Sequence, residues 1–209
     1  MKTLFITLSL LFALAVGSIY AATDKDIKVN ETRKVEEFSS IRVTSVAAIY
    51  FTQGDNYSLK IEGKEEYVKE IVASVKNETL IIDSKRDEKG NIIRKNIKEG
   101  VDVYLTAPTL KNVEFTGVGS FNCKSPLKLE NVKFNIEGVG KLNISDLTCD
   151  KFILNLGGVG NADVHVNCDF LKADVGGVGR VTLSGKAIST DISKSGVGSV
   201  NTRNLKVGK

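Results

Sequence analysis

The 209-residue sequence has few of the features that mark enzymes, membrane proteins or nucleic-acid-binding proteins. It contains one histidine, His165, so serine or cysteine catalysis by a triad would depend on that single side chain. No cysteine precedes Cys123, which excludes a lipid anchor directly after an N-terminal leader. No apolar run is long enough to span a membrane, and a net charge of +4 does not predict nucleic-acid binding. The sequence therefore predicts a soluble chain.

The first 22 residues have the layout of a secretory signal peptide. Lys2 supplies the positive charge, an apolar run extends to Val16, and Ala21 and Ala22 provide the small residues of a cleavage site. Cleavage there would leave about 187 residues, enough for one domain with a hydrophobic core. We predict an exported protein in the periplasm, on the outer-membrane surface or outside the cell.

The second half of the chain repeats a Gly-Val-Gly triplet. The five copies are Gly117-Val118-Gly119, Gly138-Val139-Gly140, Gly158-Val159-Gly160, Gly177-Val178-Gly179 and Gly196-Val197-Gly198. Their spacings of 21, 20, 19 and 19 residues are typical of a solenoid, in which each repeat buries its apolar side against its neighbours. Each repeat should form one rung, with the triplet as a corner where glycine permits close stacking of the backbone.

Residues around each triplet alternate in polarity as expected for strands. Mostly apolar residues lie two and four positions before the first glycine and four and six positions after it, which predicts that these positions face the core. Lys194 and Thr202 interrupt this pattern and indicate a polar last rung. The position five residues after the first glycine is small and polar throughout, and we predict an exposed binding column there. That column is Asn122, Asn143, Asp163, Thr182 and Asn201.

The valines at the corners are predicted to point into the core as a stacked ladder. This ladder is Val118, Val139, Val159, Val178 and Val197. On this interpretation, Val159→Asp would place an unpaired charge in the core and unfold the solenoid.

The sequence of the N-terminal half predicts strands of unequal length with turns between them. The spacing of apolar residues over residues 64–75 predicts one short amphipathic helix. Together these patterns predict an all-β fold, a single-stranded right-handed parallel β-helix of about five rungs. The predicted organisation is a cleaved signal peptide at 1–21 and a single domain at 22–209. Residues 22–106 would form a β-rich cap and residues 107–209 the rungs.

Two cysteines, Cys149 and Cys168, occupy the same position in successive repeats and should stack. Stacked Cβ atoms lie about 4.8 Å apart, longer than the roughly 3.8 Å that a disulfide prefers. We therefore predict buried free thiols, although export would permit a bridge. Cys123 belongs to a different inward column.

No cofactor or metal site is predicted. The stretch from Gly157 to Asp163 has neither the offset nor the nine-residue period of calcium-binding repeats, and strands follow the glycines where a dinucleotide site needs a helix. A β-helix enzyme acting on polysaccharides would need clustered charged residues. The charged residues of the repeats instead fall in different columns, namely Glu114, Asp163, Asp174, Lys141 and Arg180.

Several short stretches follow one another along the chain, namely Phe38 to Val43, Ile49 to Gly54, Leu80 to Ile82, Val101 to Tyr104 with Pro108 to Leu110, and the Gly-Val-Gly triplets. In this order they resemble the head GIN domain family of auto-transporter adhesins. The resemblance covers nearly the whole chain after the leader. It implies an exported single-domain β-helix, and it supplies no catalytic residues.

The favoured hypothesis is a noncatalytic exported module that binds a surface glycan or an envelope protein. Exposed Asn, Ser and Thr side chains suit hydrogen bonds to glycans, but no column of exposed aromatic residues offers a platform for stacking sugars. Two alternatives stay open, a structural protein that forms homo-oligomers and a polysaccharide-acting enzyme.

Overall fold

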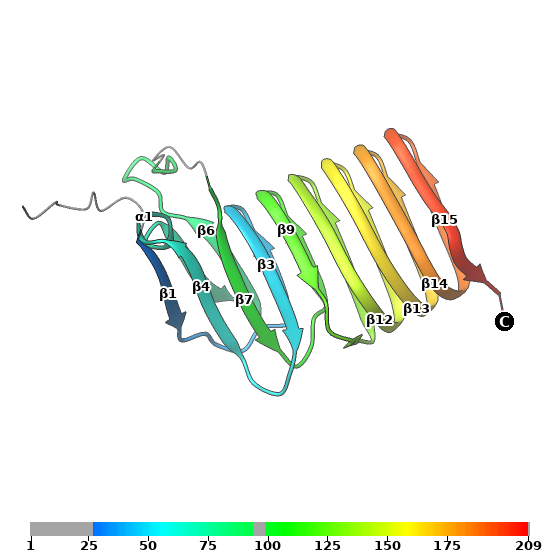
Figure 1. The fold of residues 1–209 in the computed structure, drawn as a ribbon, viewed down its shortest axis with the longest axis horizontal. Coiled ribbons are helices and arrows are strands. Elements are labelled where there is room, and N and C mark those ends of the chain that lie inside the picture. The colour runs from blue at the N-terminus through cyan, green and yellow to red at the C-terminus, as the bar shows by residue number, and fades with distance from the viewer. Residues whose placement is uncertain (1–26, 94–98, 209) are drawn as a thin grey trace, which may run out of the picture.

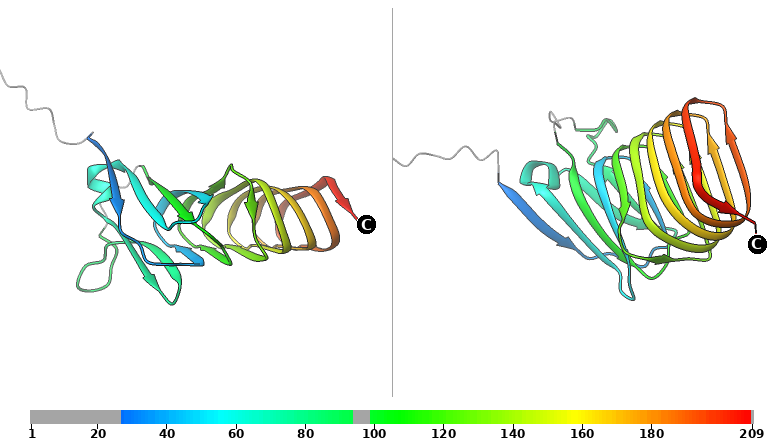
Figure 2. Two further views of the ribbon diagram at one scale, coloured as in Figure 1. Left: turned by 90° about the horizontal axis from the view of Figure 1, so that it is seen from below. Right: turned by 45° about the vertical axis from the view of Figure 1, so that its right-hand side comes forward.

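The computed structural model describes residues 27–93 and 99–208, and nearly all of its regular structure is β-strand. The chain winds into a flattened coil whose strands stack along one axis (Figures 1 and 2). We call its two broad sides the front face and the back face. The predicted parallel β-solenoid is confirmed, whereas the predicted signal peptide at 1–21 lies outside the described residues.

The front face is the side that Figure 1 presents to the viewer. Its strands, from the cap to the last rung, are β1 (Lys28–Arg33), β4 (Ser58–Lys64), β7 (Val101–Ala107), β3 (Val46–Gln53), β9 (Val118–Cys123), and the first parts of β12 (Val139–Leu156), β13 (Val159–Val175), β14 (Val178–Lys194) and β15 (Val197–Val207). The pairs β1–β4 and β4–β7 are antiparallel, and all later pairs on this face are parallel.

The back face is built from short strands of the first half and from the later parts of the long strands. In order, it contains β5 (Ile71–Lys76), β6 (Thr79–Ser84), β2 (Ser40–Val43), β8 (Asn112–Phe115), β11 (Asn131–Ile136), and then β12, β13 and β14. A narrow third side connects the two faces and begins with β10 (Leu127–Lys128), which pairs with the middle of β12. Long strands such as β12 bend around this side and so contribute to both faces.

The core fills the space between the faces with alternate side chains from every rung. Phenylalanine rings run through it in a row, with ring centroids 6.0 Å apart for Phe51–Phe121, 5.1 Å for Phe121–Phe134 and 6.0 Å for Phe134–Phe152. Because these rings come from different rungs, each rung depends on its neighbours for burial, as expected for a solenoid.

The predicted register of the five corners is confirmed, because the corner valines pair one with the next from Val118 to Val197. The structure adds a corner that the repeat search missed. Ser45, Val46 and Ala47 occupy the same place in the preceding rung, where Val46 pairs with Val118. The coil therefore begins within residues 22–106, before the first Gly-Val-Gly triplet.

The predicted inward orientation of the corner valines is wrong. Their exposed fractions are 47% for Val118, 51% for Val139, 50% for Val159, 48% for Val178 and 73% for Val197. The physical reason is that each strand already begins at the valine, so the two-residue alternation that buries the later positions also turns the valine outward. The valines do form a ladder, but it lies on the surface.

The triplet needs its glycines because backbones of successive rungs touch there. A Cβ added at Gly177 or Gly179 would overlap the carbonyl oxygen of Gly158 or Gly160 in the rung before. Gly179 also has φ of 154°, a backbone conformation that side chains disfavour. The same contact recurs at most corners, which explains why this residue pattern repeats.

The predicted helix over residues 64–75 is present only as α1 (Glu65–Val68). The segment Ile71–Lys76 is instead the edge strand β5, which pairs antiparallel with β6. Its apolar residues fit both a helical and an alternating pattern, and pairing with β6 decides between them.

Cys149 and Cys168 are paired in register, as predicted, and both are buried free thiols. The hydrogen bond shared with Cys168, together with burial, raises the pKa of the Cys149 thiol. Cys123 lies in a separate part of the core, where burial raises the pKa of its thiol.

Candidate ligand-binding face

The predicted exposed column forms a continuous row across the front face. Asn122, Asn143, Asp163, Thr182 and Asn201 pair in register on five successive strands, and each side chain is exposed or half-buried. The structure extends this row beyond the repeats to three residues of the first half, which are Tyr50, Tyr104 and Lys60. We call the whole set the Asn122 row.

Hydrogen bonds along the Asn122 row leave some of its members free to bind a ligand. Asn143 Nδ2 donates to Asn122 Oδ1 at 2.8 Å, and Asn122 Nδ2 donates to Ser120 Oγ at 2.8 Å and to the carbonyl oxygen of Ile49 at 3.2 Å. Asn122 is therefore engaged within the protein. Asp163 and Thr182 make no side-chain hydrogen bond within the described residues, so their oxygens face solvent.

The two tyrosines of the row are stacked on each other. Their ring centroids are 5.0 Å apart at an interplanar angle of 17°, and Lys60 Nζ lies 4.3 Å from the centre of the Tyr104 ring. Since β7 lies between β3 and β4, Tyr104 has Tyr50 on one ring face and Lys60 on the other. Both rings are half-buried, and little of the Tyr104 ring surface is left for stacking a sugar.

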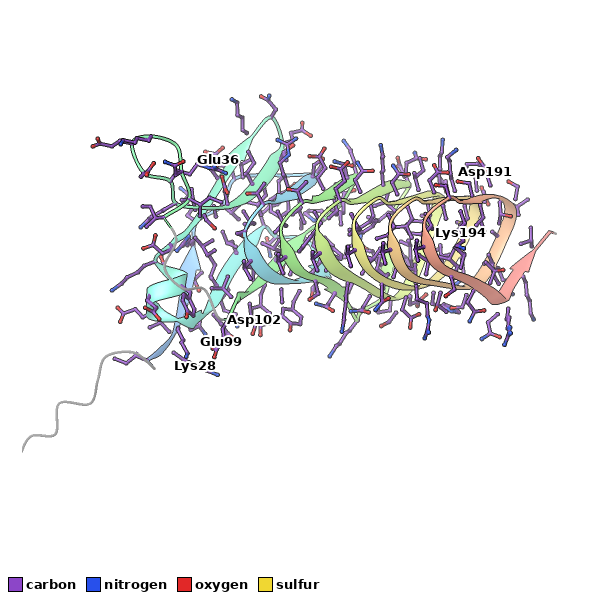
Figure 3. All side chains as sticks on the ribbon, turned by 90° about the horizontal axis from the view of Figure 1, so that it is seen from above. Lys28, Glu36, Glu99, Asp102, Asp191 and Lys194 are labelled. Carbon is purple, nitrogen blue, oxygen red and sulfur yellow. The ribbon has the colours of Figure 1, made fainter. Side chains whose placement is uncertain are left out.

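Acidic residues gather at the cap end of the front face. Glu62 accepts hydrogen bonds from Asn30 at 3.1 Å and from Lys60 at 2.8 Å, and it pairs in register with Asp102. The hydrogen bond from Lys60 holds the pKa of Glu62 below its usual value, whereas burial and the neighbouring Glu62 raise the pKa of Asp102. Figure 3 shows Asp102 near Glu99 and Lys28, and all three line one depression of about 390 Å³.

Basic residues occur farther along the face, in a second row beside the first. This Lys141 row consists of Ser120, Lys141, Asn161, Arg180 and Ser199, which pair in register on β9, β12, β13, β14 and β15. The two rows line a shallow groove of about 720 Å³, which we call the front groove. Its polar lining includes Lys141, Asn143, Asn161, Asp163, Arg180 and Thr182.

Comparison with known proteins places the chain in a family. The family model described as "Putative auto-transporter adhesin, head GIN domain" matches residues 37–209. The chain belongs to the head GIN domain family. A crystal structure titled "putative adhesin" from Bacteroides fragilis is 26% identical, with a TM-score of 0.67, and the alignment covers 84% of this chain and 96% of that one. A search of curated proteins gave no match.

A second solved structure supports the fold alone. It is titled "putative adhesin" and comes from Parabacteroides distasonis, with 21% identity, a TM-score of 0.75, and coverage of 87% of this chain and 76% of that one. The head GIN family and the β-solenoid inferred from the sequence are both confirmed.

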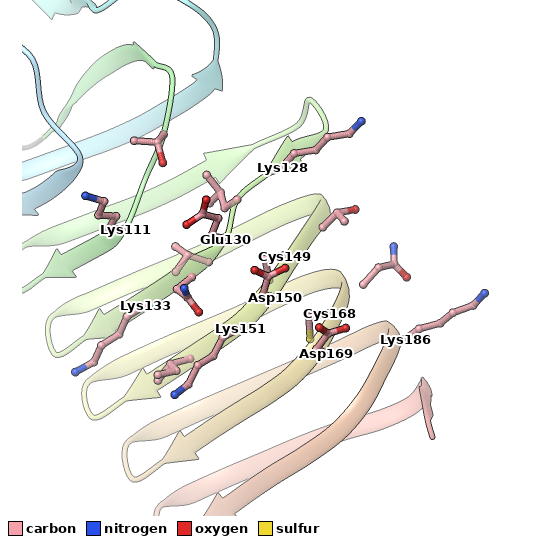
Figure 4. A pocket seen from close by; sticks show the side chains of 17 residues that line it. Lys111, Lys128, Glu130, Lys133, Cys149, Asp150, Lys151, Cys168, Asp169 and Lys186 are labelled. Atoms are coloured by element: carbon pink, nitrogen blue, oxygen red, sulfur yellow. The ribbon is translucent and has the colours of Figure 1, made fainter. Parts of the chain in front are cut away.

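This head GIN domain has a larger groove where the third side meets the back face. The back groove has a volume of about 1190 Å³, and Figure 4 shows a line of carboxylates along its middle with lysines on both sides. The carboxylates are Glu130, Asp150 and Asp169, and the lysines are Lys111, Lys128, Lys133, Lys151 and Lys186. Cys149 and Cys168 lie beneath these carboxylates. Because its middle is acidic and its rims are basic, the back groove does not favour a ligand of one charge.

The charged residues that sequence reasoning treated as scattered fall into two groups in the head GIN domain. Lys141, Arg180 and Asp163 line the front groove. Glu114 and Asp174 share one row on the back face, where Glu114 pairs with Arg42 at 2.6 Å. Strand register brings members of each group together across 17 or more residues of sequence.

His165 is exposed, and its Nδ1 lies 3.0 Å from Ser184 Oγ on the next rung. In the described part of the chain no carboxylate is hydrogen-bonded to this ring, so the pair lacks the orienting group of a triad. Within residues 27–93 and 99–208, no group of three His, Cys, Asp or Glu side chains is arranged to hold a metal ion. Over the same residues, no helix has the length and apolar character needed to cross a membrane.

Proposed function

We propose that the protein is a noncatalytic, exported interaction module that binds a cell-surface glycan or an envelope protein through its front face. The observation that carries this proposal is the Asn122 row, an unbroken in-register line of polar and aromatic side chains from Lys60 to Asn201. The rigid strands hold the row's free hydrogen-bonding groups at a regular spacing of about 4.8 Å. Such a surface suits an extended ligand that offers hydroxyl or amide groups along its length.

Two further observations support binding rather than catalysis. The family is described as "Putative auto-transporter adhesin, head GIN domain", and the Bacteroides fragilis structure is titled "putative adhesin". The charged groups of the front face lie on an open sheet surface, where solvent weakens their electrostatic effect on a reacting group. The signal-like sequence of residues 1–22 supports export.

The back face provides a matched control for the test of this proposal. Asn143, Asp163 and Thr182 stand on β12, β13 and β14 of the front face. The same three strands carry a row of similar composition on the back face, formed by Asn155, Asp174 and Ser193.

We expect the mature protein, residues 22–209, to bind one class of glycan on an array or one envelope protein in a pull-down. The triple variant N143A/D163A/T182A should lose at least about tenfold in affinity, and N155A/D174A/S193A should bind like the unmodified protein. Loss of binding only in the back-face variant would contradict the proposal. Release of new reducing ends from a polysaccharide would favour the enzyme alternative, and a concentration-dependent sedimentation shift without ligand would favour self-assembly.

A further inference from the structure

Two cations stand at a fixed interval in the front groove. Lys141 on β12 and Arg180 on β14 are separated by the shorter Asn161 on β13, and all three are paired in register. Two strand spacings correspond to roughly 9–10 Å. An extended polysaccharide that runs along the solenoid axis advances by about one strand spacing per sugar. The distance between the two cations therefore equals the distance between one sugar and the second sugar after it.

Both cations are available to a ligand. Among the described residues, neither Lys141 nor Arg180 forms an ion pair, and both side chains are exposed. Some other basic residues of the sheet are paired, such as Lys60 with Glu62 at 2.8 Å and Lys172 with Asp191 at 2.9 Å. Lys141 and Arg180 therefore place two unpaired positive charges in the groove that the Asn122 row also lines.

We propose that the front groove binds an acidic polysaccharide that carries one carboxylate on every second sugar. This inference rests on the proposed function and names its ligand class. One carboxylate lies over Lys141 and the next over Arg180, and the sugar between them lies over Asn161 and Asp163. The backbone N–H of Arg180 donates to Asn161 Oδ1 at 3.0 Å, which fixes that amide and leaves its nitrogen as a donor for the sugar.

Asp163 explains why the acidic groups must alternate with neutral sugars. Its carboxylate belongs to the middle rung, between the rungs of Lys141 and Arg180. It can accept hydrogen bonds from the hydroxyls of a neutral sugar, but it repels a carboxylate at that position. A polymer with a carboxylate on every sugar is therefore disfavoured, and a wholly neutral polymer leaves both cations without a partner.

The choice of the front groove over the back groove follows from the same reasoning. In the back groove, carboxylates occupy three successive rungs along the middle, at Glu130, Asp150 and Asp169. An acidic chain lying there would meet a carboxylate at every rung.

Three octasaccharides separate these possibilities in an isothermal titration with the mature protein. Hyaluronan has a carboxylate on every second sugar, chitooligosaccharide has none, and polygalacturonate has one on every sugar. We expect hyaluronan to bind at least about fivefold more tightly than either of the others, and its affinity to fall as salt is raised from 50 mM to 500 mM because exposed charges are screened.

Charge-reversal variants locate the site. K141E/R180E should reduce hyaluronan affinity at least about tenfold. K186E/K194E makes the same change in net charge away from the front face and should bind as the unmodified protein does, with circular dichroism confirming that both fold. D163N should strengthen polygalacturonate binding, because it removes the repelling charge.

Equal affinity for hyaluronan and chitooligosaccharide, no binding of hyaluronan, or equal loss in both charge-reversal variants would overturn this inference. The proposed function is judged separately, since N143A/D163A/T182A can abolish binding of a neutral glycan or a protein while K141E/R180E has no effect. That combined result would retain the front face as the binding surface and reject the acidic polysaccharide.

Discussion

Replacing Gly179 by alanine is expected to lower the free energy of unfolding by about 3 kcal/mol or more. The added methyl group would overlap the carbonyl oxygen of Gly160 on the preceding rung, at a φ of 154° that alanine disfavours. Because the obstructing atom belongs to the backbone, no side-chain rotation relieves the overlap, and two rungs must separate. Urea denaturation followed by circular dichroism measures the effect.

The control for Gly179 is Gly157, which directly precedes a triplet but has open space where a Cβ would lie. Gly157→Ala should change the free energy of unfolding by no more than about 0.5 kcal/mol. Equal effects of the two substitutions would show that close backbone stacking does not dictate the glycines of the triplet.

Two valines of strand β13 are expected to respond very differently to aspartate. Val164 is 0% exposed, and Val164→Asp should destabilise the protein by about 3–5 kcal/mol or prevent folding, because a carboxylate without a partner enters the core. Val159 is 50% exposed at the corner, and Val159→Asp should cost no more than about 1 kcal/mol. Thermal unfolding of both variants provides the comparison.

This expectation for Val159 reverses the one drawn from the sequence. If Val159→Asp unfolded the protein as readily as Val164→Asp, the corner valines would face the core and the register of the front face would be wrong. The same inward and outward alternation along β13 orients both Val159 and Asp163. The comparison therefore also tests whether the side chains of the Asn122 row can reach a ligand.

The repeat allowed much of the fold to be predicted, because a fixed period exposes columns that a single strand would hide. Asn122 and its partners were placed correctly for this reason. The corner valines were misplaced because glycine stands on both sides of each valine, so the sequence shows no alternation of polar and apolar side chains there. Only the continuous strand from Val159 to Val175 shows that the valine side chain points away from the core.

Features outside the repeat were not predictable in the same way. Tyr50 and Tyr104 stack across adjacent strands although 54 residues separate them, and nothing in either local sequence indicates the partner. The interval between Lys141 and Arg180 was visible in the columns, but its meaning depended on the groove and on the absence, among residues 27–93 and 99–208, of an ion pair at either side chain.

The claim that the front groove binds an acidic polysaccharide is tested most directly by mapping amide chemical shifts during titration with hyaluronan octasaccharide. We predict that the perturbed amides cluster at Lys141, Asn161, Asp163 and Arg180, the residues that line the front groove. Perturbations confined to the back groove around Asp150 and Asp169, or no perturbation at saturating ligand, would contradict it.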